Sequence, residues 1–109
     1  MIEVSGEKLK KWRNAIALEC QKYDTKDIIL SPVEVTATFY LPRPKTVSQS
    51  KRSLPIVPPD IDKLTRALLD GIGQSGVIWG DDAQVIRINI TKLYADNHST
   101  GAEVQIKVL

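Results

Sequence analysis

Five aspartates fall within the stretch from Pro58 to Val85, and they are the residues best suited to chemistry. They are Asp60, Asp62, Asp70, Asp81 and Asp82. Clustered carboxylates repel one another unless a cation or a proton intervenes. Oxygen ligands without His or Cys nearby suit Mg²⁺ or Mn²⁺, which take few protein ligands together with water and substrate phosphate. The pattern therefore indicates metal-assisted attack of water on a phosphodiester.

A helix must position the first three of these aspartates. Prolines precede Asp60, which is a good N-cap residue, so the helix is predicted to start at Ile61 or Asp62. Apolar residues then recur at helical spacing until Gly71 and Gly73, which are predicted to end it.

The acids and one cation of this helix share a face. Asp62, Arg66 and Asp70 are spaced i, i+4, i+8 and therefore form a stripe. If the strand that follows Asp82 lies beside the helix, Asp82 can approach Asp60 and Asp62. A structural interpretation stays open, because Asp also caps helices and Asp-Asp after Gly is ordinary turn chemistry.

The motifs in this stretch resemble those of a known family. The runs P-D-I-D-K-L-x-R-x-x-x-D and G-x-x-W-x-D-D-A-Q-V are similar to the signature of RusA-type Holliday junction resolvases, which are crossover junction endodeoxyribonucleases. Lys63 stands where that family usually has Asn, and Arg66 where it usually has Lys. Members usually begin with a basic, Pro-rich strand, so the first four residues are expected to be its remnant or the sign of a shortened N-terminus.

The resemblance implies a small homodimeric endonuclease of phages and prophages that acts on branched DNA in recombination and repair. Two symmetric nicks across a four-way junction require two active sites related by a two-fold axis. With the chemistry above, it implies Mg²⁺ as cofactor, with Mn²⁺ possible. The implied metal ligands are Asp60, Asp62 and Asp82. Arg66, as a catalytic cation, and Lys63 are expected to contact the phosphate. Asp70 and Asp81 are expected to support the site as additional acids.

A basic loop leads into the acidic stretch. Residues 42–59 contain five prolines and no acid, and their cations are Arg43, Lys45, Lys51 and Arg52. This composition predicts a mobile loop. We expect it to clamp the DNA backbone, with salt-dependent affinity, and the alternative is a solvated linker.

The remaining periodicity predicts an α+β fold with two helices packed on one face of a sheet of three or four strands. An amphipathic helix is expected over Ser5–Tyr23, with a basic face interpreted as solvated surface. Val33–Leu41 alternates as a strand, and a second strand from Gln84 is expected to pair with residues 103–109 as a hairpin, with Ile86 on its apolar face.

Length and composition fit one soluble domain over residues 1–109. The chain is 42% apolar and 26% charged, with a net charge of only +2, so the net charge alone does not indicate binding to nucleic acid. A single cysteine fits the reducing cytoplasm, and no apolar run is long enough to span a membrane. Two alternatives to the enzyme stay open: a catalytically silent DNA-binding or structural homologue, and a metal-free domain whose acids only shape helix and turn.

Overall fold

The protein is described by a computed structural model that covers residues 6–23 and 27–109, with side chains in the first range from position 10 onward. The expectation about the first four residues lies outside this range. The elements, in chain order, are α1 (Gly6–Gln21), β1 (Val33–Leu41), α2 (Ile61–Ser75), the 3-10 turn η1 (Asp82–Gln84), β2 (Val85–Tyr94) and β3 (Gly101–Val108).

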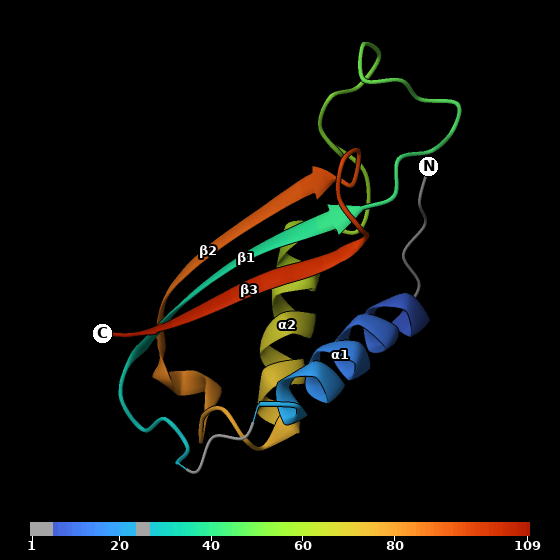
Figure 1. The fold of residues 1–109 in the computed structure, drawn as a ribbon. Coiled ribbons are helices and arrows are strands. Elements are labelled where there is room, and N and C mark those ends of the chain that lie inside the picture. The colour runs from blue at the N-terminus through green and yellow to red at the C-terminus, as the bar shows by residue number, and fades with distance from the viewer. Residues whose placement is uncertain (1–5, 24–26) are drawn as a thin grey trace.

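The three strands form one mixed sheet, and both helices lie on the same face of it (Figure 1). The strand order is β2-β1-β3, with β1 parallel to β2 and antiparallel to β3. A parallel pair needs a long crossover, and here the segment between β1 and β2 contains α2. The predicted α+β fold, with two helices on one face of a small sheet, is confirmed.

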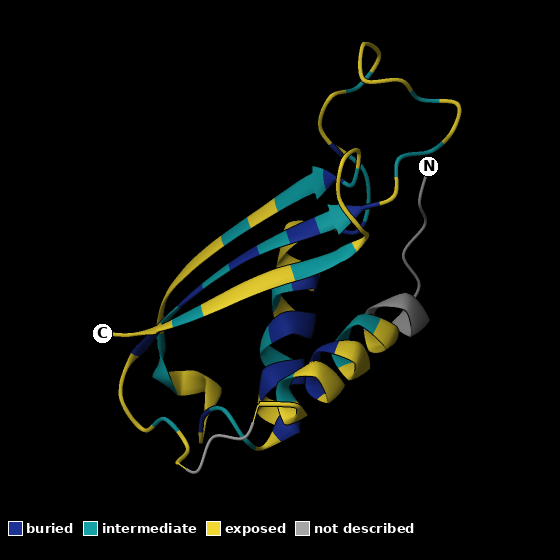
Figure 2. Cartoon of the chain, in the orientation of Figure 1, coloured by how far each residue is buried: buried dark blue, intermediate teal, exposed yellow. Residues whose placement is uncertain are grey.

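The core lies between the central strand and α2. Alternate residues of β1 are buried, and Phe39 is completely inaccessible, as are Leu64, Leu68 and Ile72 of α2 (Figure 2). From α1, the Trp12 ring meets Phe39 edge-on, with the ring centroids 5.4 Å apart. Burial of these apolar side chains stabilises the layer of helices on the sheet. Neither helix of the described chain is long and apolar enough to cross a membrane.

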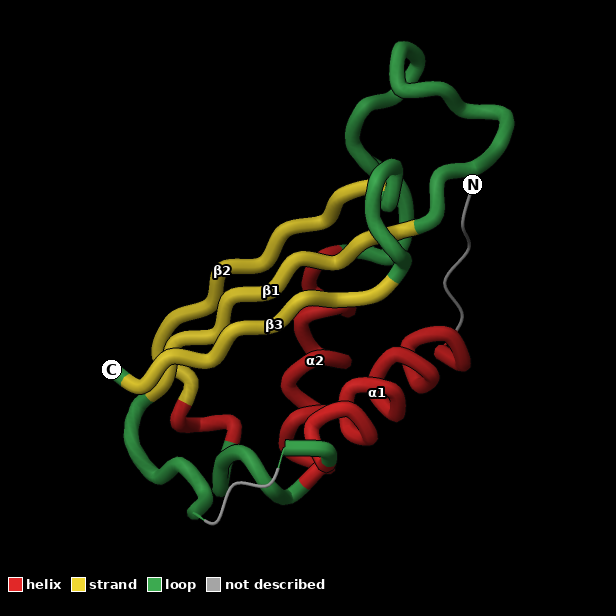
Figure 3. Tube along the Cα trace, in the orientation of Figure 1, coloured by secondary structure: helices red, strands yellow, loops and turns green. Residues whose placement is uncertain are grey.

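The predicted hairpin between the last two strands is wrong. β3 pairs with the free edge of β1, so residues 95–100 cross the end of β1 before β3 begins (Figure 3). The amide of Ala95 donates to the Leu41 carbonyl, 2.8 Å away, at this crossing. β3 can pair with β1 because β2 occupies only one edge of this central strand and leaves the other edge available.

A register shift also changes which side chains of β2 face the helices. Val33 pairs with Val85, but Glu34 pairs with Arg87, so Ile86 is an extra residue in the ladder. Val85 consequently packs against the core, and Ile86 is 66% exposed instead of inward. Prediction by strict alternation fails at a bulge, because the bulge inverts the two faces.

α2 continues past the two glycines that were predicted to end it. It ends at Ser75, with Gly76 in the left-handed conformation (φ 72°) as its C-cap. Gly71 is needed inside the helix because α1 crosses there: a Cβ would lie 2.7 Å from the Arg13 carbonyl oxygen and 2.9 Å from Ile16 Cβ. The missing side chain lets the helices approach closely.

Candidate active site

The first two aspartates of the acidic stretch lie at the start of α2, and both are exposed. Asp60 occupies the N-cap position with an extended backbone, and its carbonyl accepts the first amides of the helix. Its side chain, however, makes no capping hydrogen bond. Helix capping therefore does not account for the Asp60 carboxylate, which stays free to bind a ligand beside Asp62.

A lysine from the sheet fixes the backbone that carries this pair. The Nζ of Lys92, in β2, donates to the carbonyls of Val57 and Pro59 over 2.9 and 3.0 Å. The Pro58–Pro59 peptide is cis. Lys92 pairs in register with Phe39 and so points to the helix side of the sheet. The sequence analysis did not single out Lys92. Its spacing could have indicated it, because Lys92 follows Ile88 and Ile90 at intervals of two residues and therefore lies on the same face of the strand.

The Asp81 and Gln84 side chains serve the structure of the turn before β2. Asp81 Oδ1 accepts from the Ala83 amide at 2.8 Å and caps η1. The Gln84 carbonyl oxygen accepts from the amides of Gly80 and Asp81, and its NH₂ group donates to the carbonyls of Ile29 and Ser31. The structural interpretation thus holds for Asp81, whereas the Asp60 side chain occupies the N-cap position of α2 without making a capping hydrogen bond.

Asp82 begins η1 and lies near Gly73, close to the C-terminal end of α2, whereas Asp60 and Asp62 stand at its N-terminal end. Its Oδ1 accepts from Trp79 Nε1 at 3.0 Å and would lie 3.2 Å from a Cβ placed on Gly73. Gly73 follows Asp62 by eleven residues, about 16 Å at the α-helical rise. Asp82 therefore does not approach the first pair within one chain, contrary to expectation, because β2 begins at the far end of α2.

The acid pair offers two of the ligands that a divalent ion would need. Across the described residues, no three His, Cys, Asp or Glu side chains form a group that could hold a metal. Mg²⁺ commonly binds through one or two carboxylates and completes its shell with water and substrate phosphate. The free carboxylates of Asp60 and Asp62 fit that donor requirement.

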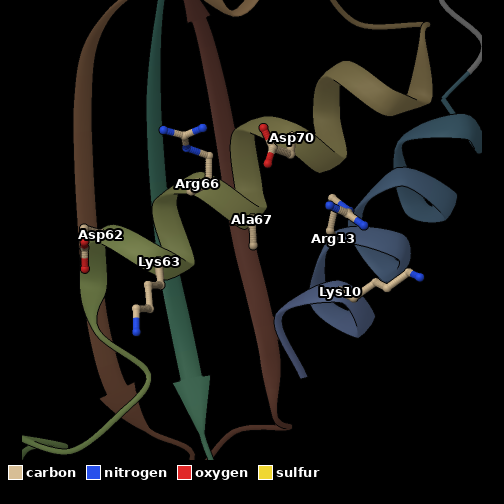
Figure 4. Close-up of a pocket in the computed structure, with 7 residues that line it drawn as sticks. All are labelled: Lys10, Arg13, Asp62, Lys63, Arg66, Ala67 and Asp70. Carbon is tan, nitrogen blue, oxygen red and sulfur yellow. The ribbon is translucent and has the colours of Figure 1, made fainter. Parts of the chain in front are cut away.

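A cleft of about 540 Å³ runs beside the acid pair, between α1 and α2 (Figure 4). Its lining contains more cations than acids: Lys10, Arg13, Asp62, Lys63, Arg66, Ala67 and Asp70. The predicted stripe of Asp62, Arg66 and Asp70 is one wall of this cleft. Lys63 adds to the positive charge there, as expected for a phosphate-facing surface.

The other wall comes from α1, whose basic face had been interpreted as solvated surface. Lys10 and Arg13 of that helix line the cleft opposite Lys63 and Arg66 (Figure 4). Gly71 was the available signal, because a glycine in mid-helix permits a second helix to approach. The periodicity of α1 alone could not show which of its cations face α2.

The basic loop is more firmly held than its composition predicted. Arg43 binds Asp96 through two hydrogen bonds of 2.7 and 3.0 Å and also donates to the carbonyls of Arg52 and Ser53. Arg52 Nε donates to the Tyr94 hydroxyl at 2.8 Å, and the Arg43 guanidinium lies 4.1 Å from the Tyr94 ring centroid.

These contacts engage two of the four loop cations that were expected to bind the DNA backbone, Arg43 and Arg52. The hydrogen bonds from Arg43 and Gln49 lower the pKa of Asp96 to about 2, so Arg43 faces a full negative charge at neutral pH. Lys45 and Lys51 are exposed, and the side chain of neither makes a hydrogen bond or ion pair with the described residues. Arg43 and Arg52 therefore hold the loop through their hydrogen bonds, and Lys45 and Lys51 are exposed to solvent.

Free carboxylates beside a cationic cleft define a protein suited to phosphodiester substrates. The family model described as endodeoxyribonuclease RusA matches residues 4–107, nearly the whole chain, so this chain belongs to the RusA endodeoxyribonuclease family. It is also similar to the uncharacterized protein YqaN of Bacillus subtilis (strain 168), with 29% identity over 98 residues, which cover 82% of this chain and 68% of that protein. The family resemblance seen in the motifs is confirmed.

Proposed function

We propose that the protein is a divalent-metal-dependent endodeoxyribonuclease that resolves four-way DNA junctions by paired symmetric nicks, acting as a homodimer in recombination or repair. Family membership supports a nuclease. The observation that supports the proposed active site is the pair of exposed carboxylates, Asp60 and Asp62, at the start of α2. The Asp60 side chain makes no capping hydrogen bond, and the pair lies next to a cleft lined by cations.

Asp60 and Asp62 would hold Mg²⁺, or Mn²⁺, through their carboxylate oxygens. When bound, the ion would lower the pKa of a water molecule and polarise the phosphodiester. Arg66 and Lys63, on the same helix, would bind the phosphate oxygens and offset the negative charge that develops on them. Asp70, two turns beyond Asp62, would orient Arg66, which lies between the two acids in the stripe.

The position of Asp82 bears on the homodimer. Because Asp82 lies at the far end of α2 from the pair in its own chain, its proposed role as a metal ligand requires Asp82 of the partner subunit. A two-fold axis would supply such an acid to both sites at once. Each subunit would then be incomplete alone, which couples cutting to assembly on the junction.

The experiment is nicking of a synthetic four-way junction beside a linear duplex of the same sequence, with Mg²⁺ and with chelator. The proposal predicts paired, metal-dependent nicks in the junction and little cutting of the duplex. A catalytically silent homologue would bind the junction without cutting it under either condition. Absence of both binding and cutting would leave the acids with structural roles only.

A further inference from the structure

The α1 wall of the cleft contains one buried nitrogen atom, Arg13 Nε, that has no hydrogen-bond partner among the described residues. Arg13 Nε is inaccessible to solvent and makes no hydrogen bond within the described residues. A buried N–H without an acceptor costs free energy, and the cost is larger for a charged group. Because buried donors in native structures are usually paired, Arg13 Nε indicates an acceptor that the described residues do not supply.

The side chains of the other cleft cations also make no hydrogen bond or ion pair with the described residues. Lys10, Lys63 and Arg66 form no ion pair with a described carboxylate, although Asp62 and Asp70 line the same cleft. Arg43 in the basic loop provides the contrast, because its charge is matched by Asp96 at 2.7 Å. The cleft thus holds a surplus of positive charge that no ion pair among the described residues neutralises.

The crossing of the two helices holds this arrangement in place. Gly71 brings the backbone of α2 against the Arg13 carbonyl, so the backbone of α1 at Arg13 has a fixed position beside α2. Ala67, between the two walls, is small and leaves the cleft open. Arginine suits such a site because its planar fork binds two oxygens of one phosphate.

We infer that Lys10 and Arg13 of α1, which line the cleft together with Lys63 and Arg66 of α2, bind the backbone phosphate of the DNA next to the scissile one. This inference rests on the proposed function and adds α1 to the substrate-binding surface. α1 would hold the strand in the cleft, and the acid pair at the start of α2 would meet the neighbouring phosphodiester.

The test measures equilibrium binding of the full-length protein to a four-way junction in chelator, so that no cutting occurs, over a series of salt concentrations. The variants are Lys10→Gln and Arg13→Gln, and the matched control is Lys11→Gln. Lys11 is exposed on the same helix, does not line the cleft and changes the net charge equally. Circular dichroism establishes that each variant is folded.

We expect each cleft variant to weaken binding about three- to tenfold at roughly 0.1 M salt and to reduce the magnitude of the slope of log K against log salt by up to about 0.9, the value for one phosphate contact on duplex DNA. Lys11→Gln should change the slope little. Equal effects of all three variants would overturn the inference.

Three further outcomes keep the inference separate from the proposed function. If Arg13→Gln fails to fold, Lys10→Gln decides the test alone, because Lys10 is exposed. If the wild-type protein does not bind the junction, the proposed function and this inference both fall. If the wild-type protein binds and the cleft variants match Lys11→Gln, only this inference falls.

Discussion

The Nζ of Lys92 donates a 3.0 Å hydrogen bond to the carbonyl of Pro59, the residue immediately before Asp60. A second bond, to the Val57 carbonyl, makes one ammonium group the link between β2 and the backbone that leads into the acid pair. Lys92 is thus a positioning residue for Asp60 across the layer between sheet and helix.

Replacing Lys92 with Met should lower nicking of a junction about tenfold or more and raise the Mg²⁺ concentration needed for half-maximal rate. The apolar stem is kept, but the carbonyls of Val57 and Pro59 lose their donor and Asp60 is less well placed. Lys107→Met, on the exposed part of β3, is the control for lost charge. A fall in stability with an unchanged Mg²⁺ dependence would assign Lys92 a purely structural role.

Asp60 and Asp81 precede helical turns in similar ways, yet only Asp81 caps one with its side chain. Asp81→Ala should therefore lower the free energy of unfolding by about 1 kcal/mol, whereas Asp60→Ala should cost less than about 0.5 kcal/mol. Urea denaturation of the two variants measures both values. An equal loss would show that the Asp60 carboxylate stabilises α2 after all.

Mixed dimers test the proposed source of the third acid. Asp62→Asn and Asp82→Asn homodimers should each lose cutting by at least about 100-fold. If Asp82 of the partner subunit completes the site, a mixture of the two chains forms heterodimers with one intact site and one doubly substituted site. Such heterodimers should regain single nicks but not paired ones. A mixture as inactive as its components would place all ligands of a site in one chain.

The Arg43–Asp96 pair predicts a defined acid sensitivity. The folded pKa of Asp96, about 2, is below its ordinary value of 3.8, so its contribution to stability is full above that ordinary value. It is lost as the pH falls from about 3.8 through about 2. In unfolding experiments between pH 5 and pH 2, Asp96→Asn should show a shallower pH dependence than the wild type. Parallel curves would contradict the assigned pKa.

The parts of the fold that sequence could predict are those with uninterrupted periodicity. β1 alternates over its whole length and is central, so its faces were predicted correctly. α2 was predicted from its cap and apolar spacing, but its end was not, because Gly71 serves helix packing instead of termination. Ile86 was placed wrongly, since a bulge leaves no mark in a pattern of alternating residues.

The candidate site divides in the same way. The acids at the start of α2 follow from local sequence, because a few consecutive residues fix their position. The place of Asp82 depends on where β2 begins relative to α2, and the roles of Lys10 and Arg13 depend on how α1 crosses α2. The spacing of residues in a single sequence does not show how elements far apart in the chain lie relative to one another. Arg43 and Arg52 were assigned to DNA for the same reason, because their partners lie more than forty residues away.

The most direct test of the account is a single pair of titrations, for cutting and for binding of one four-way junction by the Asp62→Asn variant. The substitution keeps the size of the side chain and removes the charge that a divalent ion requires. We predict that metal-dependent cutting falls by at least about 100-fold and that the junction affinity in chelator stays within about threefold of wild type. Cutting at the wild-type rate, or an equal loss of cutting and binding, would contradict the catalytic role of the acid pair.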